Sequence, residues 1–186
     1  MIIMKAINIF ILLMFLVGFC CCDDEENIHV EEEGPRRDYD INSTDPVKKI
    51  VSEFFFNTGK EFIVDPDSSD YLYNFAEKNG VKMYPVSDAN RDYLLSTVQL
   101  IKSGFLDCYT TEFVKENFPY SVIIADTIYD TGTYLTPKIV DNIARINYYG
   151  VNVAGKANLD LAEQKAFLAL VHYDFFNTYL SVFKDM

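Results

Sequence analysis

The sequence is poor in the residues that most often carry catalytic chemistry. Its 186 residues include two histidines and four cysteines, and it has no tryptophan. His29 lies in a charged amino-terminal stretch, which leaves His172 for the folded part. A catalytic zinc site built on imidazole needs two or three histidines. The scarcity of histidine therefore argues against such a site, and also against a cysteine hydrolase, whose thiol needs a histidine to activate it.

The cysteines are few and unevenly placed. Cys20, Cys21 and Cys22 are consecutive, so Cys108 is the single cysteine of the folded part. One cysteine in an exported domain cannot form an internal disulfide. Because Cys108 lies in the apolar segment GFLDCYTTEF, we expect a buried and inert thiol at this position.

Basic residues are also in short supply. Sixteen lysines and arginines face 28 acidic residues, which gives a net charge of −12 at pH 7. Such a surface repels phosphate backbones and no basic stripe interrupts it, so we expect no nucleic-acid partner. Solubility is the simpler account of the acidity. The chain is rich instead in apolar and aromatic residues, with 15 Phe and 13 Tyr, which is the composition of a packed globular domain.

The first 22 residues, MIIMKAINIFILLMFLVGFCCC, have the features of an export signal. Lys5 forms a short positive region, and residues 7–19 form an apolar run that is too short for a comfortable membrane span. The run ends in cysteines and so resembles a bacterial lipoprotein signal, in which the cysteine is acylated and becomes the first mature residue. The acceptor is Cys20, Cys21 or Cys22, and Phe19 is bulky for the position before it. A transmembrane anchor is the alternative.

An acidic segment, DDEENIHVEEEGPRRDYD, follows the cysteines. An acidic run in this place resembles the surface-export signal of Bacteroidetes lipoproteins. The segment is charged, poor in apolar residues and broken by Gly34-Pro35, so it cannot bury enough surface to fold. We therefore expect a signal peptide at 1–21, a flexible tether at 22–43 and a folded domain at 44–186. The expected location is the outer membrane, with a lipid anchor and exposure at the cell surface.

Hydrophobic periodicity in the folded part predicts a mixture of helices and strands. Capping and turn residues mark a first helix that opens at Asp45-Pro46 and ends at 57–59. The other predicted elements are strands at 61–65, 81–84 and 120–128, a helix at 89–108, a turn or helix at 110–117, one or two strands within 138–153, and a last helix at 159–183 capped by Asn158. Loops are predicted at DPDSSD (65–70) and at YDTGTYLTP (129–137). The mixture predicts a single α+β domain with a small mixed sheet packed against helices.

The last helix contains the stretch FLALVHYDFFNTYL (167–180), in which polar residues interrupt an apolar pattern. A helical zinc site uses two histidines at positions i and i+4, with a glutamate beside the first that polarises the metal-bound water. His172 is followed four residues later by Phe176, which cannot bind zinc. Tyr173 and Asn177 have the right spacing, with Asp174 beside Tyr173, but they are poor zinc ligands.

These segments carry a resemblance to a known family. Residues 45–180 resemble the zinc-binding metallopeptidase lipoproteins of Bacteroidetes, also called substrate import-associated zinc metallohydrolase lipoproteins. In 101–134, a helix leads through a Phe-Pro corner into an apolar strand and a Tyr-x-x-Gly-Thr turn, as in the family. In 166–177, AFLALVHYDFFN lies where the family carries His-His-Glu-Phe-Ala-His. The resemblance implies a zincin-like fold.

Matched in order, the active-site motif of the family is degenerate in this chain. His172 stands at the position of the extra leading histidine and Tyr173 at that of the first zinc ligand. Asp174 stands at the position of the catalytic glutamate and Asn177 at that of the second zinc ligand. Both ligand positions differ, and the base survives as the shorter aspartate. The chain also ends nine residues after Asn177, whereas the family continues and takes its third ligand from there. We therefore expect no catalytic residue, no metal ligand and no cofactor, in a domain that lacks the carboxy-terminal part of the family.

The resemblance implies a lipid-anchored envelope protein with a non-catalytic binding or scaffolding role in nutrient import. Its expected partners are the membrane, through the lipid, and outer-membrane import components. The aromatic-rich composition permits a sugar- or peptide-binding surface. The alternatives are a zinc metallopeptidase, truncated or completed by a partner, and a purely structural envelope lipoprotein. An all-oxygen metal site at DPDSSD is a further possibility, for which a plain turn is the better account.

The polar residues of the last helix have two interpretations. In the first, His172, Asp174 and Asn177 are ordinary hydrogen-bonded or solvent-facing residues of an amphipathic helix. In the second, they are relics of a metal site, retained as a polar network where the zinc once lay. Both interpretations predict that the chain does not hydrolyse peptides.

Overall fold

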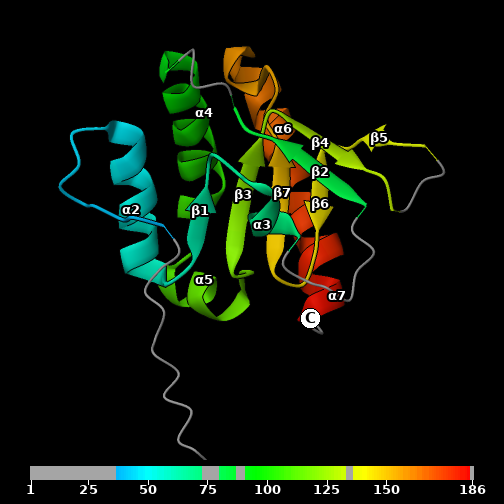
Figure 1. Cartoon of the computed structure of the whole chain (residues 1–186), viewed down its shortest axis with the longest axis horizontal. Coiled ribbons are helices and arrows are strands. Elements are labelled where there is room, and N and C mark those ends of the chain that lie inside the picture. The colour runs from blue at the N-terminus through cyan, green and yellow to red at the C-terminus, as the bar shows by residue number, and fades with distance from the viewer. Residues whose placement is uncertain (1–36, 73–79, 87–90, 133–135, 185–186) are drawn as a thin grey trace, which may run out of the picture. The chain divides into compact units, whose positions relative to one another are not determined.

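The computed structural model describes residues 37–72, 80–86, 91–132 and 136–184. Tyr39–Met186 forms one compact unit, which contains the helices and strands labelled in Figure 1. The predicted signal peptide and most of the predicted tether lie outside the described residues. No helix within the described ranges is long and apolar enough to span a membrane.

The first described helix, α2 (Pro46–Thr58), begins and ends where the sequence predicts. The Asp45 side chain accepts a hydrogen bond from the first turn, and Gly59 ends the helix with a φ of 69°. The residues before the helix pack against it, because the Tyr39 ring stacks on Phe55 with 4.1 Å between the ring centroids. The folded unit therefore begins within the segment that was expected to be a tether.

A mixed sheet of four strands lies at the centre of the unit (Figure 1). Its order is β1 (Glu61–Ile63), β3 (Ser121–Ala125), β7 (Tyr148–Asn152) and β6 (Asn142–Ala144). The first three strands are parallel, and β6 runs antiparallel to β7 at the edge. A second sheet has three antiparallel strands, β2 (Val81–Tyr84), β4 (Thr127–Asp130) and β5 (Lys138–Ile139).

The remaining helical segments are listed here in chain order: α3 (Ser68–Tyr71), α4 (Arg91–Gly104), η1 (Leu106–Cys108), α5 (Thr111–Asn117), η2 (Lys156–Asn158), α6 (Leu161–Asp174), η3 (Phe175–Leu180) and α7 (Ser181–Phe183). The segment η3 is π-helical, so the last helix (orange to red in Figure 1) widens directly after Asp174.

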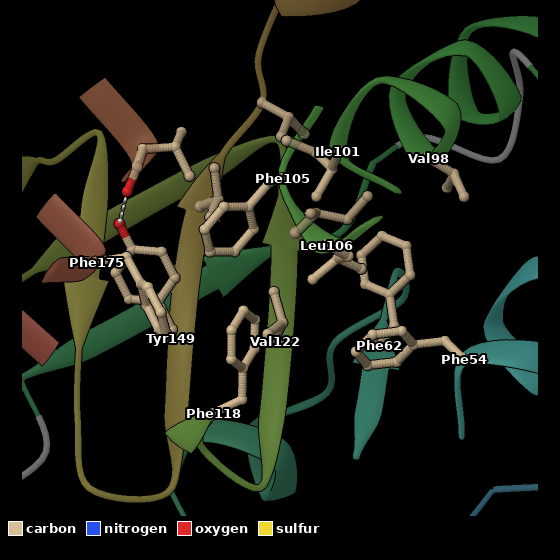
Figure 2. Close-up of a cluster of buried hydrophobic side chains, with 14 of the residues drawn as sticks. Phe54, Phe62, Val98, Ile101, Phe105, Leu106, Phe118, Val122, Tyr149 and Phe175 are labelled. Carbon is tan, nitrogen blue, oxygen red and sulfur yellow. Dashed lines mark hydrogen bonds between the residues drawn. The ribbon is translucent and has the colours of Figure 1, made fainter. Parts of the chain in front are cut away.

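The mixed sheet separates two hydrophobic clusters. Val122 and Ile124 of β3 face α2, α4, α5 and α6, in the cluster drawn in Figure 2. Ile123 and Ala125, which alternate with them, face the three-stranded sheet. Every residue of β3 is buried, as expected for a strand that is covered on both faces. The unit is therefore layered, with helices on one face of the mixed sheet and the second sheet on the other.

Close approach of the two sheets depends on Gly150 of β7. A β-carbon at this position would lie 2.8 Å from Met83 Cε, 2.9 Å from Ile143 Cγ2 and 3.3 Å from Ile128 Cδ1. Met83 and Ile128 belong to the three-stranded sheet. The absent side chain of Gly150 therefore allows the second sheet to pack directly on the first.

The prediction of an α+β domain is confirmed, and the short strand at 81–84 lies where it was predicted. The single strand predicted at 120–128 is wrong, because the chain passes there from one sheet to the other. Asp126 separates β3 from β4, and its amide donates to the Tyr84 carbonyl of the second sheet at 2.9 Å. The segment 138–153 contains three strands where one or two were predicted.

Three local predictions are also corrected. The last helix is capped by Asp160, whose carboxylate accepts from the Ala162 and Glu163 amides, while Asn158 lies in the preceding 3₁₀ turn. The predicted helix 89–108 is divided into α4 and η1, with 89 and 90 outside the described residues. The segment DPDSSD contains the short helix α3.

Candidate functional site

Two of the four motif positions of the last helix, His172 and Asp174, point in different directions. Successive residues of an α-helix are rotated by about 100°, so His172 and Asp174 lie on nearly opposite sides. Both are half-buried, whereas Tyr173 is 64% exposed and Asn177 is exposed. The Asn177 amide donates to the Tyr173 carbonyl at 2.8 Å. Tyr173 and Asn177, at positions i and i+4, lie on one face of the helix next to Asp174, and His172 lies apart from them.

Both ring nitrogens of His172 are hydrogen-bonded within the protein. Nε2 lies 2.9 Å from the Gly104 carbonyl oxygen and Nδ1 lies 2.6 Å from the Tyr109 hydroxyl. A carbonyl oxygen can only accept, so the proton of the neutral imidazole is on Nε2 and the Tyr109 hydroxyl donates to Nδ1. His172 thereby joins α6 to the end of α4 and to the residue that follows η1.

Aromatic rings surround this polar pair. Phe105, which is fully buried, lies edge-on to His172 with 5.2 Å between ring centroids, and it also contacts Tyr109 and Phe175. Figure 2 shows Phe105, Phe175 and Tyr149 of this cluster. Removing either member of the pair would therefore leave a polar group in apolar surroundings, which is costly.

Asp174 belongs to a separate hydrogen-bonded pair on the other side of α6. Its carboxylate accepts from the Asn142 Nδ2 group at 2.7 Å, which joins the helix to the edge strand β6. Asn142 Oδ1 is buried and has no hydrogen-bond partner within the described part of the chain. The nearby Tyr149 hydroxyl donates to the Val171 carbonyl at 3.1 Å, the bond drawn dashed in Figure 2. Burial raises the pKa of Tyr149, and the negative charge of Asp174 raises it further.

The expectation of a buried Cys108 is wrong. The thiol is exposed and lies 3.5 Å from the Gly104 carbonyl oxygen. In the 3₁₀ turn η1, Leu106 is buried, and a residue two positions later points away from the core. The apolar segment around Cys108 therefore packs through its other residues.

A pocket of about 110 Å³ lies between α2, the end of α4, η1 and α5. Its lining residues are Glu53, Phe54, Asn57, Thr58, Lys102, Leu106, Asp107, Tyr109, Thr111 and Val114. Tyr109 is common to this pocket and to the His172 pair. The pocket could not be predicted from the sequence, because its residues come from two distant stretches, 53–58 and 102–114.

A second candidate surface is the outer face of the three-stranded sheet. Lys82, Tyr84 and Tyr129 alternate with the buried residues of their strands, and Ile139 of the exposed strand β5 pairs with Tyr129. The Lys82 ammonium lies 4.9 Å from the centroid of the Tyr84 ring, which in turn contacts the Tyr129 ring edge-to-face. Tyr84 is 43% and Ile139 is 54% exposed. This face is the most aromatic part of the sheet surface.

The described residues contain no group of three histidine, cysteine, aspartate or glutamate side chains that could hold a metal ion. In DPDSSD, Asp67 and Asp70 instead form a capping box for α3, in which each side chain accepts from the backbone at the position of the other. In comparisons with known proteins, no family model, curated protein or solved structure matches the chain.

The bond between Tyr109 and His172 can be tested by substitution. We expect Tyr109→Phe to lower the free energy of unfolding by about 1 kcal/mol, because Nδ1 loses its donor while the ring is kept. Urea denaturation measures this change. The matched control is Tyr173→Phe, which removes an exposed hydroxyl on the helix that carries His172. We expect the free energy of unfolding of this variant to stay within about 0.5 kcal/mol of the parent. Equal effects of the two substitutions would contradict the assignment.

Stability at alkaline pH provides a further test. Burial raises the pKa of Tyr109 and Tyr149 and raises that of Tyr179 to about 12. A tyrosine whose pKa is raised on folding holds its proton more tightly in the native state, so unfolding becomes easier as the pH rises above about 10, the pKa of unfolded tyrosine. We expect the urea midpoint to fall above that pH, and less steeply in Tyr149→Phe. A midpoint that is constant from pH 9 to about 11.5 would refute this linkage.

Proposed function

We propose that this chain is a lipid-anchored cell-envelope protein with a non-catalytic binding or scaffolding role beside nutrient-import components. The observation that carries the non-catalytic part is that His172 and Asp174 are each hydrogen-bonded to another part of the protein. His172 is engaged by Tyr109 and Gly104, and Asp174 by Asn142 on the opposite side of the helix. The two ligand positions of the motif, Tyr173 and Asn177, carry side chains that are poor zinc ligands.

The zincin-like fold and the family membership are part of this proposal. Two features support them: the motif-bearing α6 packs on one face of a mixed sheet, and the antiparallel edge strand β6 contacts it through Asn142 and Asp174. The amino-terminal sequence supports the lipid anchor and an outer-membrane location. The binding role is supported by the pocket beside Tyr109 and by the exposed aromatic face around Tyr84.

The metal content of the purified full-length protein tests the non-catalytic role. After exposure to zinc and dialysis, we expect far less than one zinc ion per chain, because the side chains at the two ligand positions, Tyr173 and Asn177, are poor zinc ligands. Zinc is measured by atomic absorption, with circular dichroism to show that the protein is folded. Near-stoichiometric zinc in the parent that is lost in His172→Ala would favour the alternative, a zinc metallopeptidase, and would lead to peptidase assays.

Acylation is tested by labelling in a bacterial host with an alkyne-bearing fatty acid. We expect the label to disappear when Cys20, Cys21 and Cys22 are all replaced by serine, because the thiol is the acyl acceptor. The matched control is Cys108→Ser, which removes the exposed thiol of the folded unit and which we expect to keep the label. Single replacements then identify the acceptor. Label retained in the triple variant would exclude a lipoprotein anchor at these positions.

A further inference from the structure

The pocket beside Tyr109 is small and has an apolar floor. Phe54, Leu106 and Val114 are buried beneath it. Its volume of about 110 Å³ corresponds to a few water molecules at roughly 30 Å³ each. A ligand of about five non-hydrogen atoms is therefore the appropriate size.

The charged side chains of the pocket leave an excess of one negative charge. The Lys102 ammonium is bound by both carboxylate oxygens of Asp107, at 2.9 and 2.7 Å. Glu53 also lines the pocket and is half-buried. Its carboxylate forms no ion pair or hydrogen bond with another described residue. The Lys102 ammonium is thus neutralised by Asp107, and the charge that remains in the pocket is that of the Glu53 carboxylate.

An aromatic ring forms one wall of the same pocket. The Tyr109 hydroxyl is bound to His172 Nδ1 at 2.6 Å, and its ring stacks on Phe113 with an angle of 14° between the planes. The ring is therefore held in place from two sides. The amide of Asn57 and the hydroxyl of Thr111, both exposed, provide acceptors at the rim.

We propose that this pocket binds a small organic ammonium ion, with its charged head at Glu53, its carbon chain on the apolar floor and the Tyr109 ring beside the cation. A cation near a tyrosine ring and a carboxylate is stabilised by both. An anion would meet Glu53 and would have to compete with Asp107 for Lys102. This inference rests on the proposed binding role and adds the class of ligand.

The first measurement uses n-butylammonium chloride as the probe, in calorimetric titration of the full-length protein in detergent. We expect saturable binding with a Kd of about 1 mM, as suits a ligand of this size. We expect no binding of sodium butyrate, which has the opposite charge, and weaker binding of n-butanol, which has none. Butyrate binding at equal or higher affinity would overturn the proposal.

Two charge substitutions must change the affinity in opposite directions. Glu53→Gln removes the partner of the cation, and we expect it to weaken n-butylammonium binding about tenfold. Lys102→Gln removes a like charge and releases Asp107, and we expect it to strengthen binding several-fold. The controls are Glu116→Gln and Lys115→Gln on the exposed side of α5, which make the same change in net charge outside the pocket.

The role of the ring is tested by comparing two variants of Tyr109. Tyr109→Phe keeps the aromatic face and we expect it to retain most of the affinity, whereas Tyr109→Leu removes the face and weakens binding. Thermal unfolding shows whether each variant is folded, and Glu53→Gln provides the test if Tyr109→Leu is not.

Absence of saturable binding, or equal effects of Glu53→Gln and Glu116→Gln, would overturn the ammonium site. Either result would leave the proposed non-catalytic role untouched, because zinc content and acylation are measured independently of this pocket.

Discussion

Burial of β3 on both faces is the constraint on which the rest of the structure depends. A strand with helices on one side and a second sheet on the other is buried at every position and is therefore mostly apolar, and Ser121–Ala125 is buried throughout. Its odd and even residues contribute to different clusters. The neighbouring strand β7 meets the same requirement, and Gly150 allows the second sheet to approach it closely. The layered order of the unit follows from these two strands.

The helical face of β3 explains why polar residues are tolerated in the last helix. His172 lies against Phe105 and would be costly there without partners. The Gly104 carbonyl, at the end of α4, is left without an intrahelical partner, and Nε2 of His172 donates to it. The Tyr109 hydroxyl completes the arrangement at Nδ1. A single imidazole thus provides a hydrogen-bond donor for the carbonyl at the end of α4 and an acceptor for the half-buried Tyr109 hydroxyl.

Local features of the fold could be predicted, because they depend on neighbours in the sequence. Asp45 and Gly59 bound α2 as their residue types indicate. The true cap of the last helix, Asp160, also had a visible signal in Glu163 three residues later, which completes a capping box. Asn158 is equally able to cap, and the choice between the two required this second residue.

Features that depend on distant contacts could not be predicted. The partners of His172 lie 63 and 68 positions earlier in the chain, and hydrophobic periodicity contains no information about such pairs. The split at Asp126 has the same origin, because it follows from the pairing of the two halves of the segment with different strands. The exposure of Cys108 depends on the tight turn after α4 and not on its apolar neighbours.

The contacts of His172 bear on both interpretations of the polar residues in the last helix. As an ordinary buried polar residue, it satisfies Gly104 and Tyr109. In the relic interpretation, the positions of the metal site are Tyr173, Asp174 and Asn177, and His172 lies beside them without being a ligand. What the helix does instead is position the Tyr109 ring, which forms a wall of the pocket. His172 therefore contributes to the pocket indirectly, through its hydrogen bond to Tyr109, although its own ring does not line the pocket.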